Sequence, residues 1–535
     1  MSVHTIAQTG TGWAVSTPHS AATDAAASTF ASAGNAVDAA LAAAAMLAVV
    51  YPNQCSVGGD LIALVGTADG EVHTVNASGR APRGVDVDEV AASHRFMPLT
   101  GALPVTVPGV VSGWEVLSRR WGTKPLSDAL AVAEAAARDG VEVSAGLARG
   151  IGREPDKITA DPGLRNMFQR GGEFLREGAT LRQPQLANSL AMLKVDGAAA
   201  MYHGELGEHI VAELRARGSA MSMDDFSRHH VDFDHGIGVR FADREYVSTG
   251  GNSQGVFFLA AVRALELLRA DGDDLDPLGE SAGRVAAVLS RAAMDRDQFL
   301  GDADVAEWVL SDDHVRSMTK PQEPPRITGF PAAHGDTVGV TTADSDGLWV
   351  SLLQSVFHGF GSGILEPRSG IVLHNRGASF TLRDGSSSRL AGGKRPPHTL
   401  MPVLVRQDGL IVGSQAAMGG RAQPQIQAHL VLALAAGASA EAAVSQPRWV
   451  LDAAEWDAPI EKTSTVLVEQ GVPDRAAHSV AAAGFTVQRL GQQDDEVGHA
   501  HVIQASRDGS GDVVFEAATD PRADGSALVG RPVLT

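Results

Sequence analysis

Three short stretches of the chain carry residue types that could act together in catalysis. Thr337 follows Gly335 and Asp336, and Ser355 comes after it, ahead of a glycine-rich stretch at 360–363. A threonine hydroxyl inside a chain is a poor nucleophile, but a threonine at a chain start carries an α-amine. That amine has a pKa of about 8, which suits a general base for the neighbouring hydroxyl. The pattern therefore predicts self-cleavage before Thr337, although Gly335 to Thr337 alone would also fit an ordinary turn leading into a strand.

The segments around this site show the patterns of alternating helices and strands. Apolar residues at helical spacing predict helices at 104–121, 125–138, 183–195, 209–217, 255–269 and 424–435. Strands are predicted as a hairpin at 61–65 and 71–75, and after Asp336 at 338–342, 348–354, 371–374, 401–406 and 410–413. Because strands fall on both sides of Thr337, we expect an α/β sandwich whose sheets need segments from both halves.

Two other segments have a distinctive composition. The stretch 24–50 is rich in Ala and Val and predicts one long buried helix. Asn35 and Asp38 argue against a membrane span there, because an uncompensated acid is costly at mid-bilayer. The segment 311–334 predicts an exposed, extended lead-in to the cleavage site, although a plain interdomain loop would look the same. Its prolines are Pro321, Pro324, Pro325 and Pro331.

Composition limits the classes of partner. The chain has 535 residues, 44% of them hydrophobic, as in ordinary globular proteins. A net charge of −20 argues against nucleic acid and anionic membranes as partners. The single cysteine, Cys55, excludes an intrachain disulfide framework and a cysteine-based metal cluster. Residues 1–17 lack a basic region followed by an apolar one, so we expect a cytoplasmic protein.

No metal or other cofactor is predicted. His229, His230 and His235 lie among aspartates without the helix-face spacing of a hydrolytic metal site. No glycine-rich loop ends in Lys followed by Ser or Thr, so nucleotide binding has no support.

Several motifs in order resemble the γ-glutamyltransferase (γ-glutamyltranspeptidase) family of N-terminal nucleophile hydrolases. Asp336-Thr337 matches the processing site of that family, and Gly419-Gly420 matches its oxyanion hole. The other matching motifs lie at 33–40, 107–109, 183–184, 252–255 and 299–302. The resemblance covers nearly the whole chain and implies a four-layer αββα sandwich made as one precursor.

The resemblance implies a large subunit of residues 1–336 and a small catalytic subunit of residues 337–535, which stay together. Thr337 would attack the carbonyl of Asp336 during maturation and the substrate carbonyl afterwards. The N–H groups of Gly419 and Gly420 would stabilise the oxyanion by roughly 3–4 kcal/mol per donor. Ser355 occupies the position of a hydroxyl that orients the nucleophile, whereas from the residues alone an ordinary strand-end serine is the simpler reading.

The substrate-binding positions depart from the γ-glutamyl-specific pattern. Ala378 stands where the family has an acid for the α-amine of the substrate, and Phe357 replaces a side-chain amide that binds the same amine. His398 and Thr399 stand in place of paired serines that bind the α-carboxylate. Burying an ammonium against Phe357 and Ala378 would cost several kcal/mol. Glutathione is therefore a doubtful best substrate.

Positive charge and neutral donors remain in the predicted pocket. Arg80 and Arg376 are candidate carboxylate ligands, since a guanidinium can bind a carboxylate through two nitrogens. Surface ion pairs are the alternative reading of both. Met418-Gly419-Gly420 and Asn375-Arg376-Gly377 resemble a branch that includes oxamate amidohydrolase and acylase-like members. The implied substrate is a small oxo-acid or dicarboxylic amide without an α-amine.

The predicted activity is thus a cofactor-independent amidohydrolase or acyltransferase with an acyl-threonine intermediate, and hydrolysis is favoured over transfer. The partners would be a small amide and the two subunits themselves, with a homo-oligomer of the processed unit left open. Three alternatives remain: a true γ-glutamyl hydrolase or transpeptidase, a member that cleaves a carbon–carbon bond of an oxalyl-type group, and an uncleaved, non-catalytic binding protein.

Overall fold

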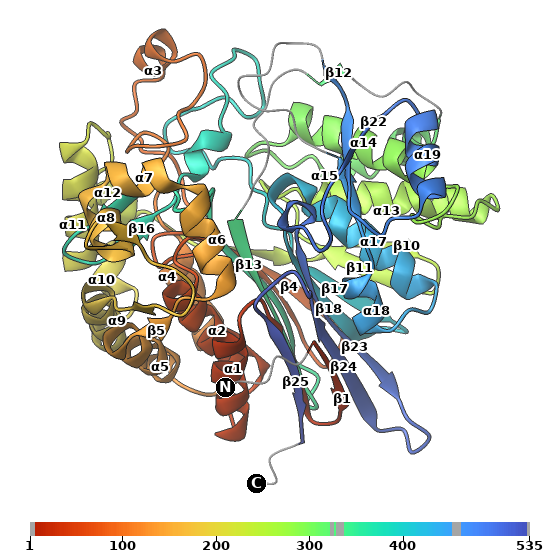
Figure 1. The fold of residues 1–535 in the computed structure, drawn as a ribbon, viewed down its shortest axis with the longest axis horizontal. Helices are drawn as coiled ribbons and strands as arrows, with labels where there is room; N and C mark the ends of the chain where they lie inside the picture. The colour runs from red at the N-terminus through yellow and green to blue at the C-terminus, as the bar shows by residue number, and fades with distance from the viewer. Residues whose placement is uncertain (1–5, 321–325, 328–335, 452–461, 532–535) are drawn as a thin grey trace.

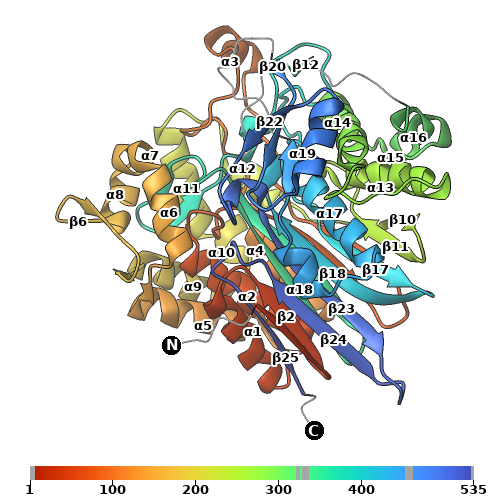
Figure 2. The same ribbon diagram turned by 45° about the vertical axis from the view of Figure 1, so that its right-hand side comes forward.

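Two seven-stranded sheets face each other at the centre of the molecule, and helices cover the outer side of each (Figures 1 and 2). The computed structural model describes residues 6–320, 326–327, 336–451 and 462–531. The first sheet has the order β25 (Ser526–Gly530), β2 (Trp13–Thr17), β13 (Asp336–Asp344), β14 (Trp349–Phe357), β3 (Asp60–Gly66), β4 (Val72–Asn76) and β9 (Asp232–His235). The second has the order β1 (Ala7–Gly10), β24 (Val513–Thr519), β23 (His499–Arg507), β18 (Leu410–Met418), β17 (Val403–Gln407), β11 (Arg244–Ser248) and β10 (Ile237–Phe241). The predicted αββα sandwich is confirmed.

Each sheet has its own helical layer. The first is covered by α1 (Ser20–Ala31), α2 (Ala36–Val50) and α4 (Val110–Trp121), behind which lie α5 (Leu126–Asp139) and α9 (Pro184–Asp196). The second is covered by α13 (Gly255–Ala270), α17 (Gln423–Ala435) and α18 (Ala440–Ser445), with α14 (Ala282–Phe299) and α19 (Asp474–Ala482) outside them. None of the described helices is both long enough and apolar enough to span a membrane.

The remaining elements are short. Helices in the same half as α4 are α3 (Val87–Ser93), α6 (Ala145–Arg153), α7 (Pro155–Ala160), α8 (Pro162–Phe168), α10 (Ala199–Tyr202), α11 (Glu205–Ala216) and α12 (Met223–Ser227), while α15 (Ala306–Val309) and α16 (Asp312–Met318) follow α14. The short 3-10 helices are η1 (Arg376–Ser379), η2 (Gly420–Ala422) and η3 (Asp495–Val497). The small sheets contain β5 (Val141–Glu142) with β8 (Thr180–Leu181), β6 (Gln169–Arg170) with β7 (Glu173–Phe174), β12 (Arg326–Ile327) with β20 (Lys462–Thr463), β15 (Ile364–Glu366) with β16 (Ile371–Leu373), and β19 (Trp449–Leu451), β21 (Thr465–Val468) and β22 (Thr486–Arg489).

The single helix predicted at 24–50 is wrong, because the segment forms two helices. Ala33 adopts a φ of 60°, which ends α1. Asn35 then caps α2 by accepting hydrogen bonds from the N–H groups of Val37 and Asp38, and Asp38 accepts from the N–H of Asn35 in return. This capping box satisfies N–H groups that a helix start leaves unpaired. All of α2 is buried, as predicted.

Other predicted elements are present with different ends or partners. The helix predicted at 104–121 begins only at Val110, because the N–H groups of Gly109 and Val110 bond instead to the carbonyl of Gly59, at 2.8 and 3.1 Å. The strand predicted at 371–374 is β16, which lies in a two-stranded sheet outside the sandwich. Within the predicted lead-in at 311–334, residues 312–318 form helix α16 and not an extended segment. The four prolines of the lead-in lie outside the described residues.

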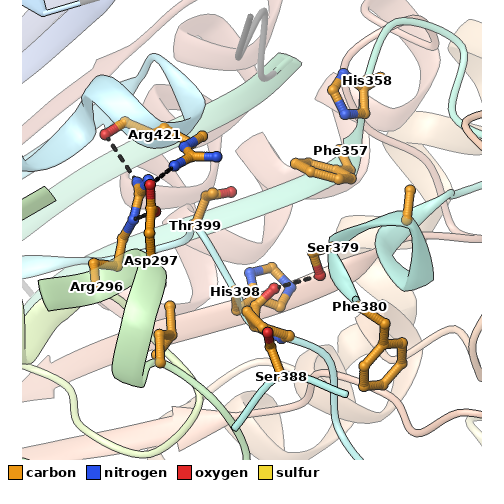
Figure 3. A pocket seen from close by; sticks show the side chains of 13 residues that line it. Arg296, Asp297, Phe357, His358, Ser379, Phe380, Ser388, His398, Thr399 and Arg421 are labelled. Carbon is orange, nitrogen blue, oxygen red and sulfur yellow. Dashed lines mark hydrogen bonds and ion pairs between the residues drawn. The ribbon is translucent and has the colours of Figure 1, made fainter. Parts of the chain in front are cut away.

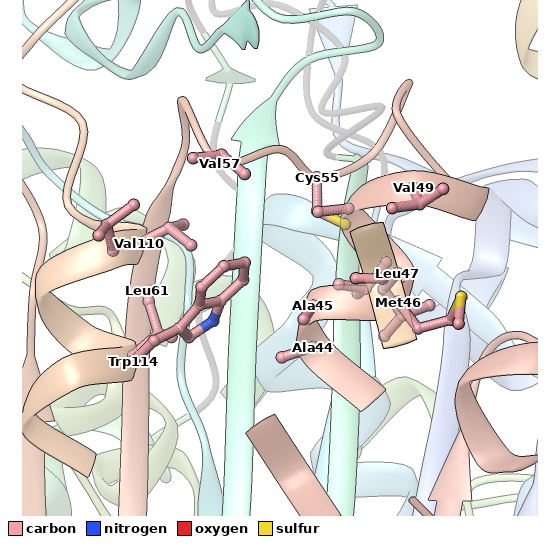
Figure 4. Close-up of a cluster of buried hydrophobic side chains, with 14 of the residues drawn as sticks. Ala44, Ala45, Met46, Leu47, Val49, Cys55, Val57, Leu61, Val110 and Trp114 are labelled. Atoms are coloured by element: carbon pink, nitrogen blue, oxygen red, sulfur yellow. The ribbon is translucent and has the colours of Figure 1, made fainter. Parts of the chain in front are cut away.

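The core under β14 fixes the position of the central strands. Figure 4 shows Trp114 of α4 beside Leu61 of β3, with residues of α2 opposite. The indole N–H of Trp114 donates to Gln354 Oε1 of β14 at 3.1 Å, and Gln354 Nε2 donates to the carbonyl of Ala44 in α2 at 2.7 Å. A fully buried amide is thereby satisfied on both sides. This arrangement holds β14 in register one residue before Ser355.

The two sheets approach each other most closely through small residues. A Cβ on Gly339 of β13 would lie 2.7 Å from the Cβ of Ala416 in β18. On the neighbouring strand β14, Ser351 Oγ donates to the carbonyl of Gln415 at 2.7 Å. Ser414 Oγ of β18 likewise donates to the carbonyl of Val350 at 2.7 Å, so β14 runs in the same direction as β18, and β13, which pairs antiparallel with β14, runs opposite to β18. The start of β13 therefore lies at the same end of the sandwich as the end of β18.

Candidate active site

Thr337 is the second residue of β13 and is buried, with 1% of its surface exposed. The ladder between β13 and β14 pairs Asp336 with Phe357 and Val338 with Gln354, so the register slips by one residue at Thr337. Such a bulge places two residues of one strand opposite one residue of the other. Ser355 and Val356 of β14 thus share the position opposite Thr337.

The hydroxyl of Ser355 contacts both groups that would react in self-cleavage. Ser355 Oγ donates to the carbonyl oxygen of Asp336 at 2.5 Å and accepts a hydrogen bond from Thr337 Oγ1 at 3.3 Å. The backbone N–H of Phe357 donates to the same Oγ at 2.8 Å and fixes its direction. The Thr337 hydroxyl is therefore held next to the carbonyl group that precedes it in the chain.

Gly419 and Gly420 follow directly after β18, at the end of the sandwich where β13 begins. Their φ values are 149° and 52°, in the region that favours glycine over residues with a Cβ. The carbonyl of Gly420 accepts a hydrogen bond from Gln254 Nε2 at 2.8 Å, and the same nitrogen donates to the carbonyl of Thr399 at 2.6 Å. Gln254 thus joins the predicted oxyanion turn to the predicted substrate-binding segment.

A pocket of about 90 Å³ opens beside these residues. Figure 3 shows Arg296, Asp297 and Arg421 on one side, with Phe357 and His358 on the other. Four of the predicted substrate-binding residues line it: Phe357, Ala378, His398 and Thr399. Thr337 is not among the described lining residues, and in this uncut chain its nitrogen is still part of the peptide bond to Asp336.

Arg376 lies directly behind the pocket wall. Its guanidinium stacks 3.7 Å from the centroid of the Phe357 ring, and Nη2 donates to Thr399 Oγ1 at 3.0 Å. Its Nε and Nη1 make no hydrogen bond to any described residue. Burial lowers the pKa of this guanidinium to about 9, although the charge of Asp60 opposes the shift. The site therefore holds a buried cation that is only partly satisfied.

Sequence reasoning missed the carboxylate of Asp60, which lies beneath this cation. Asp60 pairs with Ser355 across the β3–β14 ladder, and its carboxylate accepts from the N–H of Gly79 at 3.1 Å. Its Oδ2 lies 3.4 Å from His374 Nδ1 and 3.2 Å from His398 Nε2. Burial alone would raise the pKa of Asp60, but the two imidazoles outweigh it and hold that pKa below its usual range. Its position at the end of the Ser56–Asp60 turn was the available signal.

His398 is held as a neutral ring. Its Nδ1 accepts from the N–H of Leu400 at 3.2 Å, so the proton lies on Nε2, which faces Asp60. Burial and the charge of Arg376 lower its pKa to about 3. Because both nitrogens are engaged within the protein, His398 lines the pocket without a free donor. Its predicted part in binding a substrate carboxylate stays a prediction.

Arg80 is not at the pocket. Its Nη1 lies 3.2 Å from Asp302 Oδ2 and donates to the carbonyl of Gly393 at 3.2 Å. Arg80 is not one of the described residues that line the pocket. The alternative reading of Arg80 as part of an ion pair agrees with these contacts, and its predicted role in carboxylate binding stays a prediction.

The structure disperses the three histidines that the sequence placed together. His229 Nε2 lies 2.8 Å from Ser112 Oγ, whereas His235 faces His73 across the β4–β9 ladder. Glu71, His73 and His235 bring ligand atoms within 4.8 Å of one another at that edge of the first sheet.

A charged triad at the pocket was also missed. Arg296 Nη2 lies 2.5 Å from Asp297 Oδ1, and Arg421 pairs with the other oxygen, Oδ2. Arg296 Nη1 also donates to Gln254 Oε1 at 3.0 Å. Arg421 follows the Gly419-Gly420 pair directly, and that adjacency was the one signal in the sequence. For Arg296 and Asp297 there was no such signal in the sequence, because they lie in α14, far from this turn along the chain.

Comparison with known proteins gives a consistent result. Residues 22–530 match the family model described as gamma-glutamyltranspeptidase. The chain is 31% identical over 524 residues to the oxamate amidohydrolase proenzyme of Klebsiella pneumoniae, covering 95% of this chain and 97% of that protein. It is also 31% identical over 534 residues to the glutathione hydrolase-like YwrD proenzyme of Bacillus subtilis, covering 97% and 98%. A crystal structure of cephalosporin acylase from Bacillus halodurans matches with a TM-score of 0.88 at 26% identity, covering 100% of this chain and 98% of that one.

Proposed function

The chain belongs to the gamma-glutamyltranspeptidase family of hydrolases and acyltransferases, and we propose that it is a self-processing amidohydrolase with Thr337 as its nucleophile. The observation that supports this most directly is the position of Ser355 Oγ, 2.5 Å from the Asp336 carbonyl oxygen and 3.3 Å from Thr337 Oγ1. A single hydroxyl thus touches the attacking group and the group attacked.

Maturation would begin when Thr337 Oγ1 attacks the carbonyl carbon of Asp336. The bond between that carbon and the Thr337 nitrogen breaks, an ester forms, and the nitrogen takes up a proton to become a free amine. Water then hydrolyses the ester, which leaves a carboxylate on Asp336 and restores the Thr337 hydroxyl. Ser355 would polarise the carbonyl by its hydrogen bond and accept one from Thr337. The products are subunits of residues 1–336 and 337–535.

Turnover would use the same hydroxyl with the newly freed amine as its base. An α-amine with a pKa of about 8 can accept the Thr337 proton near neutral pH. The hydroxyl oxygen then attacks the substrate amide, and ammonia or an amine leaves with the proton. Gly419 and Gly420, at the end of β18, would donate their N–H groups to the oxyanion. Hydrolysis of the acyl-threonine completes the cycle.

We propose a small amide with a carboxylate and no α-amine as the substrate. Phe357 and Ala378 line the pocket and offer no anion or amide oxygen to an ammonium. Behind Phe357, Arg376 has two guanidinium nitrogens without hydrogen bonds to described residues. A carboxylate placed against Thr399 would complete the coordination of this cation. Such a substrate agrees with the name of the oxamate amidohydrolase to which the chain is similar.

Intact-mass spectrometry of the purified protein tests the nucleophile. We expect two fragments, one ending at Asp336 and the other beginning at Thr337. The Thr337→Ala variant should remain one chain of 55.5 kDa without activity. Thr337→Ser should still mature, because it keeps the hydroxyl and the amine. A wild-type chain that stays uncut after long incubation, or a cut and active Thr337→Ala variant, would show that the assignment is wrong.

The substrate class is tested by assaying oxamate, a glutaryl amide and glutathione side by side. We expect higher kcat/KM for the two amides without an α-amine. If glutathione were hydrolysed at least as well as both, the pocket would have an ammonium ligand other than the residues discussed here, and the chain would be a γ-glutamyl hydrolase.

A further inference from the structure

Two histidines and a glutamate meet at the edge of the first sheet, where β4 pairs with β9. His73 of β4 lies directly opposite His235 of β9 in this antiparallel ladder, and their ring centroids are 5.6 Å apart. Residues that lie opposite each other in such a pair project from the same face of the sheet. Both imidazoles therefore share one face, and β9 is the last strand of the sheet on this side.

Glu71 approaches the two rings from the same face. It directly precedes β4, and the N–H of Thr67 donates to its carbonyl at 2.9 Å, which continues the β3–β4 ladder by one pair. Because side chains alternate along a strand, Glu71 and His73 share a face, whereas Val72 between them belongs to the core. Glu71 Oε2 lies 3.7 Å from His73 Nε2, and with His235 the three ligand atoms all lie within 4.8 Å of one another.

Two imidazoles and a carboxylate at this spacing form the donor set of a transition-metal site. Zinc binds imidazole nitrogen and carboxylate oxygen at about 2.0–2.2 Å, so the ligand atoms of a tetrahedral site lie about 3.4 Å apart. The distance between Glu71 and His73 is already close to that value. The side chain of Glu71 is 57% exposed, and His235 is also exposed, so both can rotate by the small amount that an ion requires.

The surroundings of His73 hold its ring and supply negative charge. The ring contacts Trp121 at the end of α4, with centroids 5.5 Å apart. Asp69 accepts a hydrogen bond from the N–H of Glu71 at 3.2 Å, which fixes the turn before β4. The charges of two carboxylates, Glu71 and Asp69, thus act at His73 against the guanidinium of Arg120. In a protein of net charge −20, this arrangement favours a bound cation.

The cluster lies apart from the candidate active site, although both belong to the first sheet. His73 pairs with Val65 of β3, and Asp60 lies at the other end of the same strand. Five residues separate Val65 from Asp60, which at about 3.4 Å per residue is about 17 Å along the strand. An ion held by His73 would therefore act on the edge of the sheet and take no part in the reaction of Thr337.

We propose that Glu71, His73 and His235 bind one divalent transition-metal ion of the zinc class, which joins the edge strand β9 to β4. The three residues occupy one side of the ion, and water completes its coordination. The ligands come together only when β4 and β9 are paired, so the ion stabilises the folded edge of the sheet. This inference does not depend on the proposed function.

Isothermal titration of the tag-free wild-type protein with zinc chloride tests the site. We expect one equivalent to bind, and His73→Gln and His235→Gln each to weaken the affinity by about tenfold or more, since even removal of a group that only orients a ligand has an effect of that size. His230→Gln is the matched control and should bind zinc like the wild type. His230 is exposed and near His235 in the sequence, but it pairs with Asp232. Absence of binding in the wild type, or an unchanged affinity in both ligand variants, would overturn the proposal.

Hydrogen exchange locates the ion in the fold. Saturating zinc should slow amide exchange in β4 and β9 of the wild-type protein, because an ion that bridges the strands opposes their local opening. The same zinc concentration should leave exchange in His235→Gln unchanged. Zinc that binds without slowing exchange in β9 would show that the ion lies elsewhere and would overturn the proposal. Neither measurement uses turnover, so both results are independent of the role of Thr337.

Discussion

At the level of single residues, the hydroxyl of Ser355 has three hydrogen-bond partners, two of which are the residues on either side of the predicted cut. It donates to Asp336 and accepts from Thr337 and Phe357. A serine hydroxyl has one proton to donate, and here that proton goes to the carbonyl that must become electrophilic. The Thr337 hydroxyl donates to Ser355 Oγ, so Ser355 contacts the proton that Thr337 gives up when its oxygen attacks.

Replacement of Ser355 separates this role from packing. We expect Ser355→Ala to slow self-cleavage by about a hundredfold or more, in the range seen when a group that assists proton transfer is removed. Ser351→Ala is the matched control, because Ser351 lies four residues earlier on the same face of β14 and bonds to Gln415. Both rates come from gel densitometry of freshly purified precursor. If the two variants matured equally fast, Ser355 would have no part in processing.

Arg376 allows a test on the substrate side. In Arg376→Lys the charge remains, but the planar fork and its stacking on Phe357 are lost. We expect KM for oxamate to rise at least tenfold, with a smaller change in kcat. The measurement is steady-state kinetics with release of ammonia as the readout. A rise in KM of the same size for an amide without a carboxylate would indicate general damage to the pocket.

At the level of elements, the distance between β13 and β18 sets the distance between the nucleophile and the predicted oxyanion turn. Gly339 permits this approach, since its added Cβ would lie 2.7 Å from Ala416 Cβ, well inside ordinary contact. Glycine here acts through its size, because no positive φ is involved at this residue. The central strands therefore carry both the predicted catalytic residues and the small residues that bring them together.

Gly339→Ala should push the sheets apart. We expect a loss of about 1–3 kcal/mol in the free energy of unfolding, as for other overpacked cores, together with slower maturation. Gly152→Ala in α6 is the control, since nothing lies within 4 Å of its added Cβ, and it should be neutral or slightly stabilising. Urea unfolding midpoints of the uncut Thr337→Ala background measure both. A neutral Gly339→Ala would show that the sheets yield at this contact.

At the level of the whole molecule, both sheets are built from strands on the two sides of the predicted cut. β13 pairs with β2, and β14 pairs with β3, in the first sheet. In the second, β24 pairs with β1, and β17 pairs with β11. Neither predicted subunit contains a complete sheet. Neither could bury its apolar strand faces alone.

The two fragments should therefore remain together after cleavage. We expect them to coelute in size-exclusion chromatography under native conditions and to separate only in denaturant. Their elution also reports whether the processed unit forms an oligomer. Separation of the fragments in native buffer would contradict the interleaved sheets as the source of their association.

Buried histidines predict how stability depends on pH. Burial lowers the pKa to about 3 in four of them: His229, His398, His429 and His501. In the unfolded chain the same rings bind protons below about 6.5, so the unfolded state binds more protons between these values. Stability should thus fall as the pH falls from about 6.5, by up to about 1.4 kcal/mol per pH unit for each histidine.

Urea unfolding of Thr337→Ala between pH 7 and 5 measures this slope. His429→Gln should reduce it by up to one proton, because the ring of His429 is buried and its Nε2 lies 3.0 Å from the carbonyl of Trp449. His203→Gln, at an exposed position, serves as the control. A slope near zero in the parent would mean that these histidines are protonated in the folded state.

Local patterns in the sequence were enough to predict the sandwich, helices α4, α5, α9, α11, α13 and α17, and the segment that contains Thr337, but not α14, α18 or α19 of the second helical layer. They gave wrong helix bounds where the backbone conformation depends on hydrogen bonds to caps or to residues distant in the sequence. The segment 24–50 breaks at Ala33 because Asn35 caps a second helix, and residues 104–109 stay out of a helix because Gly109 and Val110 bond to Gly59. The spacing of apolar residues does not predict such hydrogen-bond partners.

The sequence by itself determined the position of the predicted nucleophile, the boundary between the predicted subunits, the family, and the presence of Phe357 and Ala378 where the resemblance implies ligands for an α-amine. Each of these can be identified from neighbouring residues or from motifs that occur in a fixed order along the chain. Only the tertiary structure placed Asp60 next to His398, paired Arg80 with Asp302 and joined Arg421 to Asp297. Those contacts link residues more than a hundred positions apart. They exist because two sheets and their helices pack in one particular register, and no local preference of the chain encodes that register.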